Sequence, residues 1–355
     1  MNIGILSMQR VMNYGSFLQG FALKKTIEEL SHKCEFVDIE QGTTFPELRR
    51  TPSFLFQKAW ERYGKWDILK RIRYTQIFQQ RFRNEFFGIL GVNVHQCPHF
   101  DTVVIGSDEV FNFAQRVPWG YTPQLYGKVS NADKVISYAA SFGHTTMADI
   151  EHYGVKKEIT EALASMQAIS VRDDNSYTIV KELTGKPPLR HVDPVLMFDY
   201  SPYIKPVTAR DYIIVYTYPN RIKDKKEVKA IKAFARKHNK KLISIGFYFP
   251  WCDETVIPDP FEVLGYIKQA DYIVTDTFHG SVMSLKLNRP FAAIVRSSNK
   301  QKMTSLLSQF RLENHIVDDM EKLEERLLLS SNYDFVNAEL QKERVQSLDY
   351  LKKNL

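Results

Sequence analysis

Short apolar runs alternate along the chain with longer amphipathic stretches. In the first half, "NIGIL" (2–6), "TVVIG" (102–106) and "VISYAA" (135–140) have the length and the Val/Ile content of buried strands. The stretch "SFLQGFALKKTIEELS" (16–31) instead spaces its apolar residues as a helix does. Strands that alternate with helices predict α/β units with parallel sheets.

The second half repeats this pattern. "DYIIVYTY" (211–218), "KLISI" (241–245), "DYIVTD" (271–276) and "PFAAIV" (290–295) read as strands with helical stretches between them. The chain has 355 residues, and domains of ~150 residues are common, so we expect two of them. We predict an α/β fold with two Rossmann-like domains that face a cleft.

The boundary between the two predicted domains lies near residue 205. Three prolines fall between residues 193 and 207, and the pattern of apolar and polar residues changes there. The predicted domains are therefore 1–205 and 206–334, followed by a C-terminal helix over 335–355 that packs on either domain.

Residues 49–87 interrupt the first domain as a helical insertion with ten Lys or Arg among many aromatic residues. Basic, aromatic helices are typical of surfaces that meet anionic membranes. The alternative is a solvated helical pair whose aromatic side chains pack on the first domain.

Composition narrows the class of protein. The hydrophobic content is 44%, as in ordinary globular proteins. Three widely spaced cysteines, without a CxxC pair, argue against disulfides or a zinc site and favour a reducing compartment. The N-terminus has no basic region typical of a signal peptide, and no apolar run approaches the ~20 residues that span a bilayer. We expect a cytoplasmic protein, with a peripheral position at the inner face of the membrane as the alternative. Its net charge of +7 suits anionic partners.

Several familiar motifs are absent from the sequence. No HExxH or EF-hand spacing occurs, and we expect no bound metal. The chain also lacks GxGxxG after its first strand, a P-loop and the GxSxG nucleophile elbow, so we expect no dinucleotide cofactor.

Polar residues cluster where the predicted strands end, at "NYG" (13–15), "GSDEVFN" (106–112), "SVRDD" (170–174), "VDP" (192–194) and "TDTFHG" (275–280). Each segment taken singly is explained by turn and cap chemistry. Open α/β sheets bind ligands at the carboxyl ends of their strands, so together these segments predict one site. The candidates that they supply are Asn13, Tyr14, Ser107, Asp108, Arg172, Asp276, His279, Gly280 and Ser281.

Six segments, "NYGSFLQGFAL", "VIGSDEVFN", "YAASFG", "SVRDD", "VDPVLM" and "TDTFHGSVMSLKLNRPF", stand in the order of the polysaccharide pyruvyl transferase family, which the chain resembles over residues 1–310. The resemblance implies a GT-B-like architecture with an acceptor-side first domain and a donor-side second domain. It implies a transferase that moves the pyruvate unit of phosphoenolpyruvate onto a sugar as a ketal, in exopolysaccharide or capsule biosynthesis.

The resemblance also carries residue roles. The family arginine of its S-x-R-D/E motif matches Arg172, and the family histidine matches His279. A later family lysine matches Lys302, with Lys300 as a competitor. Many members carry arginine two residues before the histidine, where this chain has Thr277.

These roles are chemically consistent with phosphoenolpyruvate. The guanidinium of Arg172 suits a carboxylate, and a lysine with the N–H groups near Gly280 and Ser281 suits a phosphate. His279 is the candidate general acid. Asp108 either orients or deprotonates the acceptor hydroxyl, or it caps a helix over 109–112.

Two other functions stay open, a nucleotide-sugar-dependent GT-B glycosyltransferase and a non-catalytic glycan-binding relative. The expected partners are phosphoenolpyruvate, a free or lipid-linked sugar acceptor and an anionic membrane surface. Nucleic acid is not expected, because the basic residues form no recognisable binding module.

Overall fold

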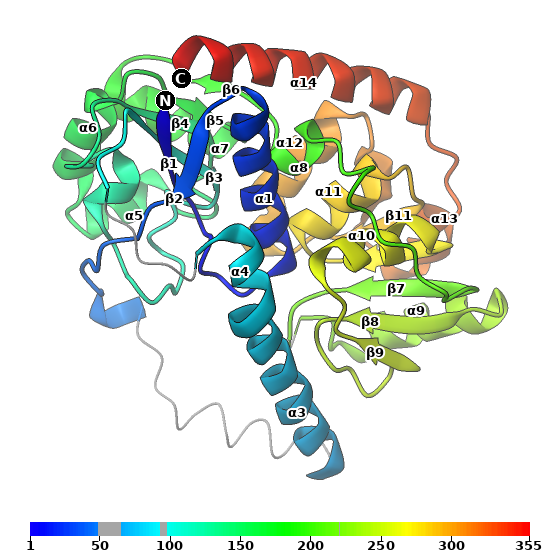
Figure 1. Ribbon diagram of the computed structural model, residues 1–355. Coiled ribbons are helices and arrows are strands. Elements are labelled where there is room, and N and C mark those ends of the chain that lie inside the picture. The colour runs from blue at the N-terminus through cyan, green and yellow to red at the C-terminus, as the bar shows by residue number, and fades with distance from the viewer. Residues whose placement is uncertain (49–64, 93–97, 220) are drawn as a thin grey trace. The chain divides into compact units, whose positions relative to one another are not determined.

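The computed structural model describes residues 1–48, 65–92, 98–219 and 221–355 (Figure 1). The chain divides into two units. Unit 1 comprises Met1–Arg49, Phe87–Phe198 and Glu339–Leu355, and unit 2 comprises Arg50–Phe86 and Asp199–Ala338.

Unit 1 is built on a six-stranded sheet in which every strand pairs in parallel with its neighbours. The strand order is β2-β1-β3-β4-β5-β6, so the direction of winding reverses between β1 and β3. The strands are β1 (Asn2–Leu6), β2 (Lys33–Phe36), β3 (Thr102–Asp108), β4 (Val135–Ala140), β5 (Ser170–Val171) and β6 (Leu189–Arg190). All seven residues of β3 are buried, as expected of a central parallel strand covered on both faces.

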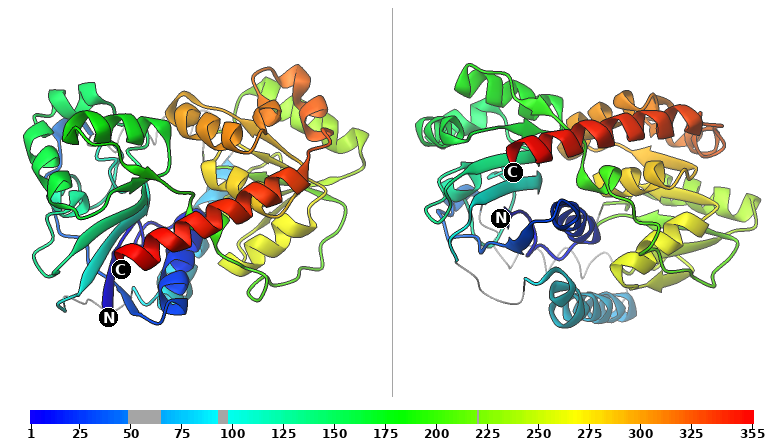
Figure 2. Two further views of the ribbon diagram at one scale, coloured as in Figure 1. Left: turned by 90° about the horizontal axis from the view of Figure 1, so that it is seen from above. Right: turned by 45° about the horizontal axis from the view of Figure 1, so that its top comes forward.

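Helices flank this sheet, as the further views of Figure 2 show. They are α1 (Tyr14–Glu29), η1 (Pro46–Leu48), α4 (Phe87–Leu90), η3 (Pro123–Tyr126), α5 (Met147–His152), α6 (Lys156–Ser165), α7 (Asp174–Thr184) and α8 (Pro194–Met197). The helix expected over 109–112, after Asp108, does not form. A turn stands there, with Asn112 N–H bonded to the Glu109 carbonyl.

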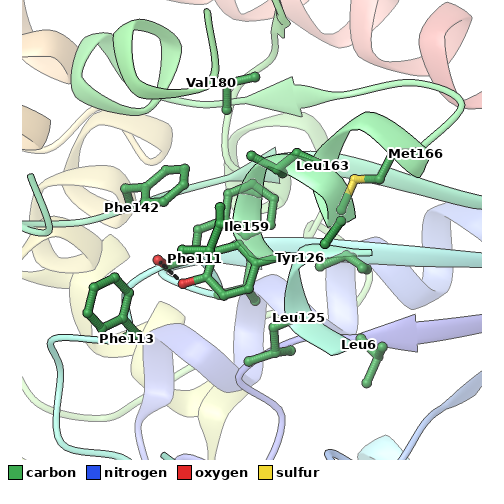
Figure 3. Packing of buried hydrophobic residues seen from close by; sticks show 14 of the residues in the cluster. Leu6, Phe111, Phe113, Leu125, Tyr126, Phe142, Ile159, Leu163, Met166 and Val180 are labelled. Carbon is green, nitrogen blue, oxygen red and sulfur yellow. Dashed lines mark hydrogen bonds between the residues drawn. The ribbon is translucent and has the colours of Figure 1, made fainter. Parts of the chain in front are cut away.

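The hydrophobic core of unit 1 contains a close group of aromatic rings (Figure 3). The Phe111 ring stacks on that of Tyr126 at 5.4 Å between centroids and lies 5.2 Å from that of Phe142. The Tyr126 hydroxyl donates to the Phe111 carbonyl at 2.7 Å. This bond satisfies a buried polar group that would otherwise destabilise the core, and it holds the turn that follows β3.

Unit 2 repeats the architecture with the order β12-β11-β10-β7-β8-β9, and its strands also pair in parallel. Winding reverses between β7 and β10. The strands are β7 (Tyr212–Tyr216), β8 (Lys241–Ile245), β9 (Glu254–Val256), β10 (Tyr272–Thr275), β11 (Phe291–Ile294) and β12 (Ile316–Val317). The predicted fold class, α/β with two Rossmann-like domains, is thus confirmed.

The helices of unit 2 include one that the sequence places in the insertion. They are α3 (Lys65–Arg81), a π-helix η2 (Phe82–Phe86), α9 (Lys225–Lys237), α10 (Pro260–Gln269), α11 (Phe278–Lys286), η4 (Ser297–Asn299), α12 (Lys300–Gln309), η5 (Glu313–His315), η6 (Met320–Lys322) and α13 (Leu323–Leu327). Helix α10 begins with a capping box, in which Asp259 accepts from the Glu262 N–H and the Glu262 side chain accepts from the Asp259 N–H.

The described part of the insertion, residues 65–86, lies with unit 2, which differs from its expected place in the first domain. The Tyr74 ring stacks on Tyr248 at 5.5 Å, and the Phe78 ring lies 4.9 Å from that of Phe247. These partners are more than 160 residues away in sequence, so no local pattern identifies them. The expected helical residues before Lys65 lie outside the described residues.

The chain passes between the units four times, at 49/50, 86/87, 198/199 and 338/339, rather than once near residue 205. The last helix, α14 (Tyr333–Asn354), begins in unit 2 and ends in unit 1. Its Tyr350 hydroxyl donates to the Ser137 carbonyl in unit 1 at 2.7 Å. The predicted C-terminal helix over 335–355 therefore belongs mainly to unit 1.

His191 makes the stability of unit 1 depend on pH. Its buried ring packs against Tyr138 and Tyr350 and lies 2.7 Å from the Ser170 hydroxyl. Burial lowers the pKa of His191 from 6.5 to about 4. Between these values the unfolded chain binds a proton that the folded chain does not, so stability falls as the pH falls.

We predict that His191 contributes up to ~3 kcal/mol to the loss of unfolding free energy across this window, at ~1.36 kcal/mol per pH unit. Urea unfolding between pH 7 and 4 should give a shallower pH dependence for His191→Gln than for the wild type. His152→Gln, at an exposed histidine of the same unit, is the control. Equal slopes in all three proteins would contradict the prediction.

Candidate functional site

In unit 1, the predicted residues meet where β1 and β3 end side by side. The Ser7 hydroxyl, just after β1, donates to the Ser107 carbonyl in β3 at 3.1 Å. The Ser16 hydroxyl, in the first turn of α1, donates to Asp108 Oδ2 at 2.8 Å. This is the point of reversed winding at which doubly wound sheets bind ligands.

Gly106 shapes the end of β3. Its φ is +127°, and a Cβ there would lie 2.1 Å from the Tyr138 carbonyl oxygen, so only glycine fits. Asp108, two residues on, has a φ of +78°, which aspartate tolerates better than most residues. This backbone directs the Asp108 carboxylate toward both α1 and Arg172.

Arg172 lies between two carboxylates. Its Nη1 donates to Asp193 Oδ2 at 2.6 Å, and its Nη2 donates to Asp108 Oδ1 at 3.1 Å. Only 2% of the side chain is exposed. Burial on its own would lower the pKa of Arg172, but Asp108 and Asp193 outweigh it and raise the pKa. The guanidinium is therefore a permanent charge that links the ends of β3, β5 and β6.

Asn13, Tyr14 and Ser107 have structural contacts in this region. Asn13 caps α1, where its side chain accepts from the Gly15 N–H at 2.7 Å. Tyr14 is buried in the first turn of the same helix. Ser107 is fully buried and donates to the Ala139 carbonyl at 3.2 Å. These contacts fix the position of α1 and β3 beside Asp108.

A second polar cluster at this edge was missed by the sequence analysis. Asn112 Nδ2 lies 2.6 Å from Glu109 Oε2 and 3.2 Å from His144 Nδ1, and its Oδ1 accepts from the Thr145 hydroxyl at 2.8 Å. His144 is exposed. Glu109 lies in the segment 106–112, and His144 directly follows "YAASFG", so that signal was available in the sequence.

In unit 2, Asp276 joins the segments on both sides of the winding reversal. Its Oδ1 accepts from the Thr217 hydroxyl at 2.6 Å, and its Oδ2 accepts from Arg296 Nε at 3.2 Å. Its carbonyl accepts from Asn299 Nδ2 at 2.8 Å. Burial raises the pKa of Asp276, while Thr217 and nearby arginines oppose that rise. Asp276 thus organises the loops around α11.

Helix α11 begins at Phe278, within the polar segment 275–280 that follows β10. Thr277 is its N-cap, and the Thr277 hydroxyl accepts from the Gly280 N–H at 3.0 Å. A Cβ on Gly280 would lie 2.1 Å from Thr275 Oγ1, so a larger residue would displace the helix from β10. Ser281 is fully buried, and its N–H bonds the Thr277 carbonyl at 3.3 Å.

His279 and Lys302 both lie near the aromatic ring of Phe278. The His279 ring is perpendicular to that of Phe278 at 5.4 Å, and Lys302 Nζ lies 5.6 Å from the centre of the Phe278 ring. His279 is buried in the first turn of α11, and Lys302 is half-buried on α12. Lys300, the first residue of α12, is exposed. Of the two lysines, Lys302 is thus the one that lies near the Phe278 ring.

Arg221 is a further cation at this edge that the sequence analysis did not select. Its Nη1 donates to the Asp276 carbonyl at 3.1 Å, and its guanidinium lies 4.9 Å from the centre of the Tyr218 ring. It stands in the loop after β7, without a motif to mark it. A guanidinium has five N–H donors, so Arg221 suits an anion at the start of α11.

Comparison with known proteins identifies a family. The sequence model of polysaccharide pyruvyl transferases matches residues 13–298, which is most of the chain. The match includes every predicted site residue except Lys300 and Lys302. No curated protein sequence matches the chain.

Solved structures share the fold at low sequence identity. The glycosyltransferase of kitacinnamycin is 10% identical with a TM-score of 0.51, over 100% of this chain and 98% of that one. The UDP-GlcNAc 2-epimerase of Methanocaldococcus jannaschii, solved with UDP-GlcNAc and UDP, is 13% identical with a TM-score of 0.50, over 99% and 100%. At such identities these likenesses concern the two-domain GT-B fold alone.

The buried Arg172 cluster predicts a large stability effect. Arg172→Ala leaves Asp108 and Asp193 as uncompensated buried charges, and breaking such a pair costs about 3–5 kcal/mol. Arg172→Lys should lose less, because an ammonium retains the charge without the fork that reaches both carboxylates.

Urea unfolding would measure both variants. The control is Arg190→Ala, whose guanidinium pairs with Asp174 at an exposed site and should contribute at most ~1 kcal/mol. A loss for Arg172→Ala no larger than that of the control would contradict the role of this cluster.

Proposed function

Because the chain belongs to the polysaccharide pyruvyl transferase family, we propose that it transfers the pyruvate unit of phosphoenolpyruvate to two hydroxyl groups of one sugar, forming a ketal. The acceptor is a sugar of a surface polysaccharide or of its lipid-linked precursor. The observation that best supports a donor site is that His279 and Lys302 both lie near the Phe278 ring, at the N-terminus of α11.

The reaction requires proton transfer and two C–O bonds. A proton is added to the methylene carbon of phosphoenolpyruvate, which leaves an oxocarbenium-like carbon beside the phosphate ester. One sugar hydroxyl attacks that carbon, the C–O bond to phosphate breaks, and a second hydroxyl attacks to close the ketal. The two hydroxyl protons balance the proton added to carbon and the proton carried by the released phosphate.

In this proposal His279 supplies the proton to the methylene carbon. Imidazole exchanges protons near neutral pH, which suits a general acid. Lys302 and the first N–H groups of α11 bind the phosphate, since the beginning of a helix favours negative charge. The proximity of all these groups to Phe278 supports a single donor site in unit 2.

The donor carboxylate is assigned to Arg221 rather than to Arg172. Both terminal nitrogens of Arg172 already bond carboxylates within unit 1, so its role in the proposal is to hold Asp108 in place. Arg221 bonds a neutral carbonyl beside Thr277. It therefore supplies the positive charge that many family members carry as the arginine replaced here by Thr277.

Unit 1 is the acceptor side in this proposal. Asp108 accepts from Arg172 and Ser16, and an ion-paired carboxylate is a weak base, which suits orienting a hydroxyl better than deprotonating it. Glu109 and the exposed His144, which share Asn112, are better placed chemically to accept the hydroxyl protons.

The proposed chemistry is tested by His279→Gln, which keeps a polar side chain but cannot act as a general acid near pH 7. Removing general acid catalysis typically costs ~10²–10⁴-fold in rate. We expect kcat to fall by that factor while the melting temperature stays close to that of the wild type. Phosphate release from phosphoenolpyruvate with lipid-linked and free glycans, together with mass analysis of the glycan, provides the assay.

His238→Gln is the matched control, because that histidine also lies in unit 2 but pairs with Glu324. Wild-type turnover in His279→Gln would make His279 a structural residue. Consumption of a nucleotide sugar in place of phosphoenolpyruvate would replace the proposed reaction with glycosyl transfer. Glycan binding without turnover of either donor would make the protein a non-catalytic relative.

The two lysines of α12 give a second test. If Lys302 binds phosphate, Lys302→Ala should raise the KM for phosphoenolpyruvate about 10- to 100-fold, the range of one charged hydrogen bond. Lys302→Arg should restore part of this loss, and Lys300→Ala should behave as the wild type. Steady-state kinetics at varied phosphoenolpyruvate would decide, and the opposite result would assign the phosphate contact to Lys300.

A further inference from the structure

One face of α3 anchors this helix to unit 2. The rings of Tyr74 and Phe78 pack on Tyr248 and Phe247, and Tyr248 donates to Asp67 Oδ1 at 3.0 Å. The Arg81 guanidinium also bonds the Ile257 carbonyl. Helix α3 is therefore a fixed part of unit 2, and its other face points away from these contacts.

That other face has a row of large apolar side chains. Trp66, Leu69 and Ile72 recur at three-residue spacing and are 80%, 58% and 44% exposed. Among the described residues, eight large hydrophobic side chains are exposed, and these three fall within one short stretch of a single helix. Scattered apolar residues are normal on a surface, whereas a contiguous row indicates an interaction.

Basic residues accompany this row. Arg73 is exposed, and Lys70 is exposed at the edge of this face, with its Nζ 5.7 Å from the centre of the Tyr248 ring. Counting Lys65, Lys70, Arg71, Arg73 and Arg81 against Asp67, the helix has five positive charges and one negative, a net charge of +4. Exposed Trp and aliphatic side chains flanked by Lys and Arg are typical of helices that lie in the interface of an anionic bilayer.

We propose that the outer face of α3, made of Trp66, Leu69, Lys70, Ile72 and Arg73, docks on an anionic lipid bilayer. The positive charge of this face favours a lipid bilayer over a second copy of the chain. A second copy of the chain across a twofold axis would bring like charges at Lys70 and Arg73 together, whereas anionic headgroups attract them. No helix among the described residues is long and apolar enough to cross a membrane, so α3 lies on the surface.

This docking does not depend on the proposed reaction, but it would bring the enzyme to lipid-linked acceptors. The apolar row enters the boundary between headgroups and acyl chains, and the basic residues remain at the level of the headgroups. Because binding combines both contributions, removing either one should weaken it.

Vesicle flotation of the full-length protein tests the proposal. Vesicles of phosphatidylcholine alone are compared with vesicles of equal parts phosphatidylcholine and phosphatidylglycerol. We expect binding to the anionic vesicles only. Two double variants should each weaken this binding by about tenfold or more. Trp66→Ser with Leu69→Ser removes apolar side chains that enter the bilayer. Lys70→Glu with Arg73→Glu reverses two charges, and each basic residue near the surface adds several-fold to affinity.

Helix α9 offers a matched control. Lys229→Glu combined with Lys232→Glu changes the charge by the same amount on a basic helix of the same unit, and the exposed large hydrophobic residues of the described chain include none from α9. This variant should bind vesicles within about threefold of the wild type. Trp66→Ser alone, at a largely exposed side chain, serves if a double variant does not fold.

Three results would overturn the proposal. The first is failure of the wild type to float with anionic vesicles. The second is an equal loss in the α9 variant, which would indicate non-specific attraction by net charge. The third is a change of oligomeric state in the α3 variants, with unchanged vesicle binding, which would make this face a contact between copies of the chain.

Discussion

One buried carboxylate, that of Asp276, holds together the carboxyl edge of the unit 2 sheet. This carboxylate accepts from Thr217, just after β7, and from Arg296, beyond β11. The backbone carbonyl of Asp276 accepts from Arg221 and Asn299. Burying a charge is unfavourable unless hydrogen bonds and opposite charges compensate it. Because these bonds come from two separate loops, after β7 and after β11, the start of α11 has a fixed position. Every donor-site residue that we assign to unit 2 depends on that position.

At the equivalent point of the unit 1 sheet, the signs of the charges are reversed. There a cation, Arg172, stands between the carboxylates of Asp108 and Asp193, and Glu109 lies nearby. The edge of unit 1 is consequently rich in acidic groups, whereas that of unit 2 presents Arg221 and Lys302. Acidic groups suit the orientation and deprotonation of sugar hydroxyls, and basic groups suit a donor that carries a carboxylate and a phosphate. The division of charge agrees with an acceptor side in unit 1 and a donor side in unit 2.

The sequence predicted what depends on local periodicity and missed what depends on contacts between distant residues. The strands and the α/β class follow from apolar runs. The unit to which α3 belongs could not be predicted, since it is decided by the packing of Tyr74 on Tyr248. The Asp108–Arg172–Asp193 cluster joins three of the segments that the sequence assigned to one site, but the ion pairs between them were not predicted. Only the topology of the sheet brings their side chains together.

The turn at Thr277 requires both a cap for α11 and a positive charge. The Thr277 hydroxyl accepts from the Gly280 N–H, and the close approach of Gly280 to Thr275 leaves no room to move the helix. An arginine at 277 has no oxygen with which to cap α11. Arg221 instead reaches the same turn from the loop after β7 and bonds the carbonyl of the preceding residue. Capping and positive charge, which a single position cannot supply together, are thus provided by two residues in the loops that follow the adjacent strands β7 and β10.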